Sequence, residues 1–151
     1  MYWEAYQRQP EVKISLNGKI FEYILAILFV RELILPLYLN AKVAFVPNVN
    51  YDLMFYTTER GLICISAKTS LREIYKQADL ETIALKYVHR KALSFLIKLE
   101  EKEARSVKEK IKSGDVIGLD KVVVATSYEF KELVEELKSY KFSEPTTVKV
   151  I

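Results

Sequence analysis

Asp52 and Lys68 have the residue types and the placement that suit phosphodiester chemistry. Asp52 stands at the start of a predicted strand over 53–57, and Lys68 near the end of the next one, over 62–69. The connection 58–61 ends in Gly61, which can adopt a positive φ, so we expect a hairpin. The hairpin would bring the two charges together, where an acid and a Lys can hold Mg²⁺ and position water against a phosphodiester. The same spacing fits an edge salt bridge equally well.

Side-chain alternation places Ser66 and Lys68 on one face of the second strand. Residues 63, 65 and 67 then point to the other face and into the core.

Glu22 and Glu81 are two further acids that are expected near this site. Glu22 is the single charged residue between Ile20 and Val30, in a predicted buried helix over 19–35. A carboxylate on an apolar helix face is costly unless it is paired or binds a metal. Exposure in the first helical turn is the alternative for Glu22.

Glu81 falls in the middle of an apolar helical stripe at positions 71, 74, 78, 85, 88, 92 and 96, whereas Asp79 points to the opposite side. If one acid of this helix enters the site, we expect Glu81. The alternative for Glu81 is a buried carboxylate that pairs with a core Lys or Tyr.

This pattern resembles the PD-(D/E)xK nuclease superfamily, over about residues 18–85. The resemblance matches Glu22 to the acid of the family's first helix, Asp52 to its first strand acid and Lys68 to its Lys. It departs in two places: Tyr51 replaces the Pro, and Ser66 replaces the acid two residues before the Lys. Some similar restriction enzymes keep Ser there and take an acid from the following helix, to which Glu81 would correspond.

The resemblance implies Asp52 and Glu81 as ligands of Mg²⁺, with Mn²⁺ as a substitute, Lys68 as the group that stabilises the transition state, and Glu22 as an accessory acid. Contacts to DNA are expected from the residues around and after Lys68: Ser66, Ser70, Arg72, Lys76 and Gln77. A second basic cluster, Lys86, His89, Arg90 and Lys91, is interpreted as a solvated helix face. An apolar strip of Leu80, Ile83 and Tyr87 is either core or a dimer contact.

The remaining elements complete a single α/β domain over 1–151, a mixed sheet flanked by helices with a restriction-endonuclease-like αβββαβ core. The core is expected over about 18–127. A short strand is predicted at 43–46, the helical pattern runs from 71 to about 99, and a charged helix follows at 100–112. Another strand is predicted at 121–126, a helix at 129–140 and an edge strand at 148–151. The helices at 100–112 and 129–140 are predicted as additions to the core.

Composition excludes several classes of protein. The chain has 151 residues, half of them hydrophobic, and a net charge of +3, which is weak evidence for a polyanionic partner. The single His argues against a multi-His metal site and against a Ser-His-Asp triad. The single Cys suits a reducing, cytoplasmic setting. The longest apolar run, 23–30, is too short to cross a membrane, so no membrane partner is expected.

The first functional hypothesis is therefore a Mg²⁺-dependent DNA endonuclease of the restriction, repair or recombination type. A chain this small that cuts both strands would act as a homodimer. The alternative is a nuclease-fold module with weak or no activity that binds nucleic acid or a partner subunit. A third hypothesis is a structural protein whose acids form salt bridges.

Overall fold

The computed structural model describes residues 14–43, 46, 49–69, 74–99 and 101–145. Nine helices and strands lie within these residues. In chain order they are α2 (Ile14–Arg31), β1 (Tyr38–Ala41), β2 (Tyr51–Thr57), β3 (Gly61–Lys68), α3 (Ile74–Val88), β4 (Leu93–Lys98), α4 (Glu101–Ser113), β5 (Lys121–Val124) and α5 (Tyr128–Lys138).

The five strands form one mixed sheet in the order β1-β2-β3-β4-β5. The first three strands pair antiparallel, and β3, β4 and β5 pair parallel. The β2–β3 hairpin predicted from the sequence is present, and Gly61 has a φ of +69°. In the parallel pair, Lys68 at the end of β3 is in register with Lys98 at the end of β4. This sheet confirms the predicted α/β class.

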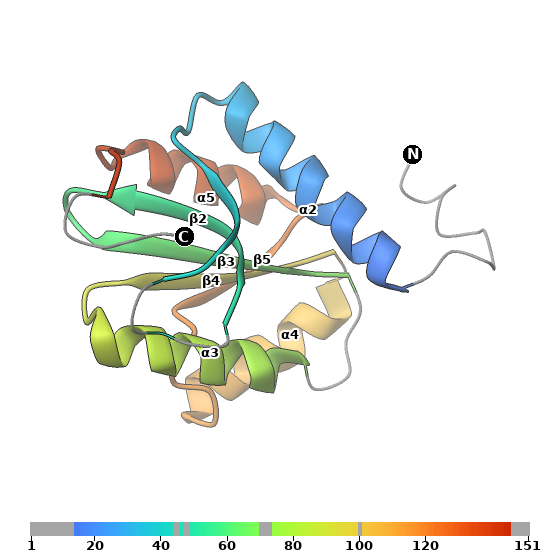
Figure 1. The fold of residues 1–151 in the computed structure, drawn as a ribbon. Helices are drawn as coiled ribbons and strands as arrows, with labels where there is room; N and C mark the ends of the chain where they lie inside the picture. The colour runs from blue at the N-terminus through green and yellow to red at the C-terminus, as the bar shows by residue number, and fades with distance from the viewer. Residues whose placement is uncertain (1–13, 44–45, 47–48, 70–73, 100, 146–151) are drawn as a thin grey trace.

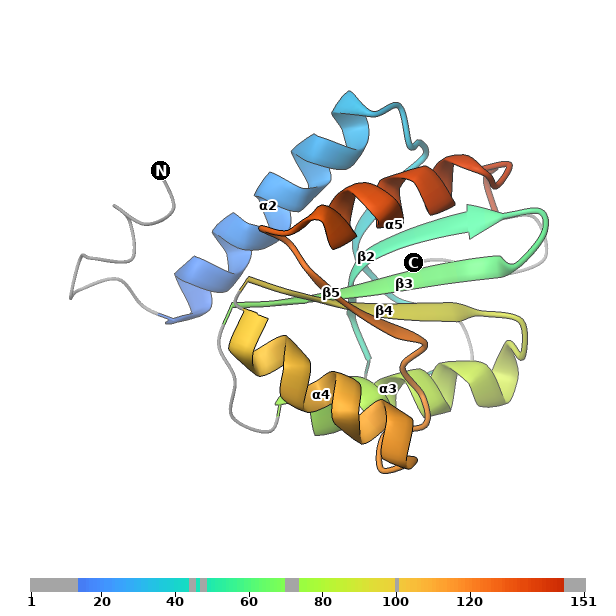
Figure 2. The ribbon, with the colours of Figure 1, turned by 180° about the vertical axis from the view of Figure 1, so that it is seen from behind.

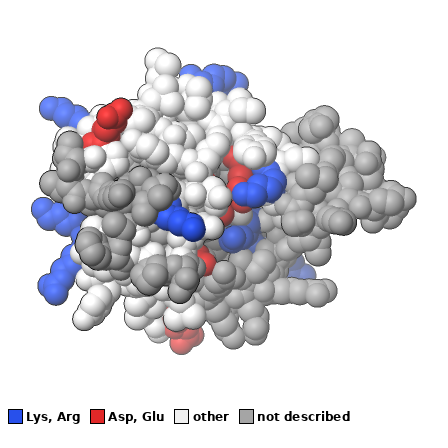
Figure 3. Space-filling view, viewed as in Figure 1, with Lys and Arg blue, Asp and Glu red and all other residues white. Residues whose placement is uncertain are grey.

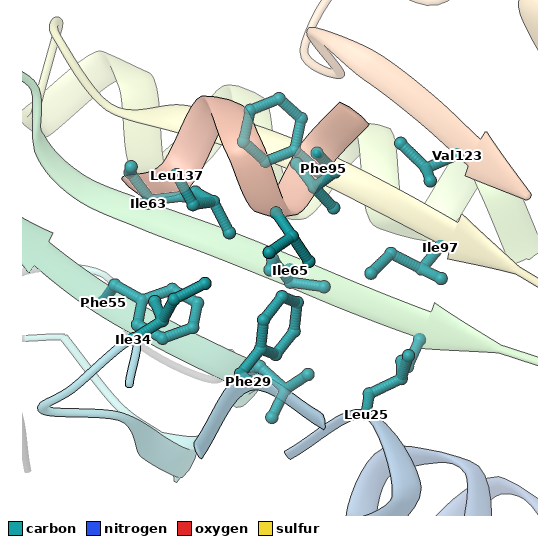
Figure 4. Close-up of a cluster of buried hydrophobic side chains, with 14 of the residues drawn as sticks. Leu25, Phe29, Ile34, Phe55, Ile63, Ile65, Phe95, Ile97, Val123 and Leu137 are labelled. Atoms are coloured by element: carbon teal, nitrogen blue, oxygen red, sulfur yellow. The ribbon is translucent and has the colours of Figure 1, made fainter. Parts of the chain in front are cut away.

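The helices cover both faces of the sheet, as Figures 1 and 2 show from opposite sides: α2 and α5 lie on one face, α3 and α4 on the other. The main core lies between the sheet and the α2–α5 layer. Figure 4 shows Phe29 of α2 beside the sheet residues Phe55 and Ile65, with Leu137 of α5 close by. The Phe29 and Phe55 rings meet edge to face at a centroid distance of 5.4 Å, a favoured aromatic arrangement.

Helix α5 belongs to this core and is not an appendage to it. Its buried side chains are Leu133, Val134 and Leu137. The Ser127 hydroxyl caps its first turn by accepting a hydrogen bond from the Glu129 N–H at 3.2 Å. The helix predicted at 129–140 is thus confirmed as α5, at Tyr128–Lys138.

The long helix predicted from 71 to about 99 is wrong in its second half. Helix α3 ends at Val88, and the chain turns at His89, whose carbonyl accepts from the Ala92 N–H at 3.1 Å. Residues Leu93–Lys98 form β4, which is buried along its whole length. A strand buried on both faces is a continuous apolar run, and Ala92 and Leu96 continued the helical spacing by coincidence.

Two smaller predictions also differ from the structure. The first strand is β1 at Tyr38–Ala41 rather than 43–46. Helix α2 spans Ile14–Arg31 rather than the predicted 19–35. The predicted edge strand at 148–151 lies outside the described residues. Within the described part of the chain, none of the helices combines the length and the apolar character that crossing a membrane would require.

Candidate active site

Asp52 stands where the β2–β3 ladder opens. The antiparallel register runs from Thr57 and Gly61 down to Leu53 and Ile65. One step further on, the Asp52 Oδ2 accepts a hydrogen bond from the Ala67 N–H at 2.9 Å. A backbone donor that would otherwise lose its partner at the end of the ladder is therefore satisfied by the carboxylate, which is fixed in turn.

Lys68 reaches the same carboxylate oxygen. Its Nζ lies 3.6 Å from Asp52 Oδ2, and the two side chains are 30% and 18% exposed. The pair is thus partly screened from water yet accessible from outside. The hairpin brings together the two residues that the sequence singled out.

Glu22 joins this pair from α2. Its side chain is 12% exposed, and its Oε2 accepts a hydrogen bond from Lys19 Nζ at 3.1 Å. Burial raises the pKa of the Glu22 carboxyl above its ordinary value, and the negative charge of Asp52 raises it further, while Lys19 and Lys68 oppose this rise. The hydrogen bond to Glu22 likewise raises the pKa of Lys19. Two carboxylates and two ammonium groups therefore interact at this end of the sheet, and we call Lys19, Glu22, Asp52 and Lys68 the charge cluster.

Near the middle of the face that Figure 3 shows, acidic side chains lie next to basic ones. A mixture of this kind is expected where carboxylates need compensation by cations, because like charges close together are destabilising.

The chain contains a second Asp–Lys pair of similar construction. Asp120 Oδ2 accepts from the Ser94 N–H at 2.8 Å and from Lys86 Nζ at 2.6 Å. The side chains of this pair, 24% exposed for Lys86 and 32% for Asp120, are exposed to a similar degree as those of Lys68 and Asp52. An Asp carboxylate that accepts from a backbone N–H and pairs with a Lys is therefore not by itself a sign of catalysis. The pair of Asp52 and Lys68 differs because it interacts with a further carboxylate, that of Glu22.

Glu81 lies on α3 and is half-buried. Its backbone carbonyl accepts from the Tyr51 hydroxyl at 3.2 Å, and the charge of Glu81 contributes to raising the pKa of Tyr51, after burial and Cys64. Among the residues that the structure describes, no group of three His, Cys, Asp or Glu side chains could hold a metal ion. Glu81 is thus not gathered with Asp52 and Glu22 into a three-acid site.

Asp79, expected on the outer side of the same helix, is buried at 8% exposure. Its carboxylate accepts hydrogen bonds from the backbone N–H groups of Ile117, Gly118 and Leu119, in the loop before β5. The helical stripe therefore misplaced Asp79. Its partners on a distant loop explain why an acid can be buried there.

The predicted DNA contacts are only partly visible. Ser66 is 7% exposed, so a contact with DNA there would require the surrounding residues to move. Ser70 and Arg72 lie outside the described residues, and Lys76 and Gln77 are placed on α3 by their backbone alone.

Lys98 is a residue that sequence reasoning missed. It ends β4 beside Lys68, and it is 2% exposed and engaged in an interaction. Lysine is rarely buried to this degree without a partner. A helix over 93–98, as the apolar spacing predicts, would not place Lys98 next to Lys68. The contact from Lys19 to Glu22 was visible in principle, as an i, i+3 pair on one helix.

Comparison with family models, curated proteins and solved structures finds no match. Inferences about function therefore rest on the geometry of the described residues. It shows a five-stranded mixed sheet, within the described residues, that carries the charge cluster at one end.

Proposed function

We propose that this chain is a metal-dependent endonuclease that hydrolyses phosphodiester bonds in DNA. The observation that carries the proposal is the ion pair of Lys68 and Asp52 at 3.6 Å. The Glu22 carboxyl lies close enough for the charge of Asp52 to raise its pKa. The second pair, Lys86 and Asp120, shows that an isolated ion pair would not suffice for this conclusion.

The four side chains would divide the work. The Lys68 ammonium would stabilise negative charge on the phosphate in the transition state. The Ala67 N–H fixes the Asp52 carboxylate, and Lys19 fixes that of Glu22, so that both oxygen donors are held before substrate arrives. Carboxylates that are already held in place need not reorganise during the reaction. The cost avoided in this way accounts for much of the rate enhancement at such sites.

The donor set fits a magnesium ion. Mg²⁺ prefers oxygen ligands and is commonly held by one or two carboxylates, with water and substrate phosphate completing its shell. Asp52 and Glu22 would hold it here, and Mn²⁺ would substitute. The ion, when bound, would neutralise phosphate charge and lower the pKa of a bound water. The assignment of Glu81 as a ligand stays a prediction, which a Glu81→Gln variant tests.

The alternative function is a module of weak or no activity that binds nucleic acid or a partner subunit. One observation favours it: among the described residues no group of three acids could hold a metal ion, and Ser66 stands where the nuclease pattern has an acid. Retention of DNA without cleavage would favour this alternative.

The experiment that tests the function is cleavage of supercoiled plasmid DNA with Mg²⁺ or Mn²⁺ present. We expect nicked and linear products from the natural chain, and none after Lys68→Ala. Lys86→Ala is the matched control, because it removes an ammonium from the corresponding pair between α3 and the loop before β5. Cleavage that survives Lys68→Ala would refute the assignment.

The homodimer also remains a proposal. Leu80 and Tyr87, on the outer side of α3, are 67% and 86% exposed, while Ile83 is half-buried. Side chains this apolar and this exposed gain from burial against a second copy. The free, buried Cys64 suits a reducing compartment, so we also propose a cytoplasmic location.

A further inference from the structure

A basic pocket lies at the opposite end of the sheet from the charge cluster. It has a volume of about 340 Å³ and lies between the β2–β3 connection and the turn from α3 to β4. Figures 1 and 2 agree that these two connections lie at one end of the sheet. Four of its lining residues are basic: Arg60, His89, Arg90 and Lys91. We call it the hairpin-end pocket.

The wall that carries Arg60 is fixed by hydrogen bonds. The Thr57 hydroxyl accepts from the Arg60 N–H at 3.1 Å and donates to the Gly61 carbonyl at 3.2 Å, and Thr57 is fully buried. The Thr58 N–H donates to the Lys141 carbonyl at 3.0 Å, which fastens the connection to the segment after α5. Arg60 is therefore presented by a preorganised turn.

Two residues of the pocket lining each carry a nitrogen atom without a hydrogen-bond partner in the described part of the chain. Arg60 Nε and His89 Nε2 are both buried, and neither has a hydrogen-bond partner among the described residues. Buried polar atoms are nearly always satisfied, by protein, water or a ligand. Arg60 Nε is a permanent donor, so only an acceptor can satisfy it. Burial lowers the pKa of His89, and a neutral imidazole still offers one N–H.

The charge balance of the pocket favours an anion. Arg60, Arg90 and Lys91 are cationic at neutral pH, and Arg90 and Lys91 are exposed. Glu59 is the acid of the lining, and both of its carboxylate oxygens already accept from the Lys141 N–H, at 3.2 and 3.1 Å. That contact lowers the pKa of Glu59, so it stays ionised and offsets one of the three positive charges.

We propose that the hairpin-end pocket binds a phosphate group, which accepts hydrogen bonds from Arg60 and His89 and is neutralised by Arg90 and Lys91. Arg is suited to this task because its planar guanidinium presents several donors to one phosphate. The volume holds a phosphate with part of its water, since a water molecule occupies about 30 Å³ in the liquid.

The phosphate has two possible sources, a small phosphorylated molecule or the backbone of DNA. Strand β3 starts at Gly61, beside the pocket, and ends at Lys68 in the charge cluster. Seven residue steps along a strand span roughly 23 Å, which is about seven base-pair steps of B-DNA. A duplex of that length spans the same distance, and the pocket does not depend on nuclease activity.

The test is a titration of the full chain with inorganic phosphate, followed by calorimetry and by amide chemical shifts. We expect saturable binding that is about tenfold weaker in Arg60→Gln and also weakened in Lys91→Gln, a change at an exposed site that leaves the fold intact. Arg31→Gln, which removes an exposed Arg from α2, is the control and should bind as the natural chain does.

A second arm measures the affinity for a short DNA duplex over a range of salt concentrations. If Arg60→Gln weakens duplex binding and lowers the salt slope by about one, the DNA backbone is the source of the phosphate. If it weakens only phosphate binding, the ligand is a small molecule. Both outcomes support the pocket. Absence of saturable phosphate binding, or an equal loss in Arg31→Gln, would overturn it.

Discussion

Replacement of Asp52 by Asn separates catalysis from structure at the charge cluster. The Asn side chain keeps an oxygen that can accept from the Ala67 N–H, so the hydrogen bond of 2.9 Å that holds the end of the hairpin is retained. What is lost is the negative charge that faces Lys68 and Glu22. If Asp52 holds a metal ion, activity should fall much more than stability does.

The two magnitudes can be worked out from the structure. Lys68 and Asp52 are 30% and 18% exposed, and ion pairs of this kind contribute about 1 kcal/mol or less. For a chain of this size that lowers the midpoint of thermal unfolding by about 2 to 4 °C. Loss of a preorganised charged group at the reacting phosphate costs about 100- to 1,000-fold in rate. The fall in rate therefore corresponds to about 3 to 4 kcal/mol, several times the loss in stability.

The assay is plasmid cleavage with Mg²⁺ together with thermal unfolding of the same preparation. Asp120→Asn is the matched control, because Asp120 also accepts from a backbone N–H and pairs with a Lys. We expect it to lose similar stability and no activity. Equal activity of the two variants would refute the catalytic role of Asp52. So would a loss of activity that only follows unfolding.

Three further predictions test other parts of the structure. Burial and the charge of Asp52 raise the pKa of Glu22, so the native state binds this proton more tightly than the unfolded chain does. The free energy of unfolding should therefore fall as pH rises just above 4.5. Glu22→Gln should flatten this pH dependence, measured by urea unfolding, and an unchanged slope would contradict the pKa shift. Asp79→Ala removes the acceptor of three backbone N–H groups and should cost about 3 kcal/mol, measured by urea unfolding, whereas a loss below about 1 kcal/mol would mean that the loop before β5 finds other partners. Tyr87→Glu, at an exposed position, should convert a dimer to a monomer in sedimentation, and an unchanged mass would exclude this face as the contact.

The local hairpin could be predicted from the sequence because its signals are short-range. Two short apolar runs joined by a glycine-containing turn predict the strand pairing, and the alternating direction of side chains along a strand gives the face on which Lys68 emerges. The approach of Asp52 to Lys68 follows from that pairing alone. Helix α5 was equally predictable, because its period and its Ser127 cap agree.

Strand β4 could not be predicted, because its burial is a tertiary property. Every residue of Leu93–Lys98 is covered, by the helices on either face of the sheet, and no alternation remains to distinguish the strand from a buried helix. The position of Lys98 beside Lys68 was lost with it.

The burial of Asp79 could not be predicted for a similar reason. An apolar stripe shows which face of a helix is buried against its neighbours, but it does not show which polar group finds partners elsewhere. Asp79 is buried because a loop 38 to 40 residues further along the chain supplies its donors. Contacts over that distance leave no periodic signal in the sequence.

The binding of Mn²⁺, mapped by paramagnetic broadening of amide signals, tests most directly whether the charge cluster grips a divalent cation. Mn²⁺ is suitable because it prefers the same oxygen ligands as Mg²⁺. We predict selective broadening of the Glu22, Asp52 and Ala67 amides at low metal concentration, with loss of this effect in Asp52→Asn. Broadening that is centred on Asp120, or that is the same in the natural chain and in Asp52→Asn, would contradict the account.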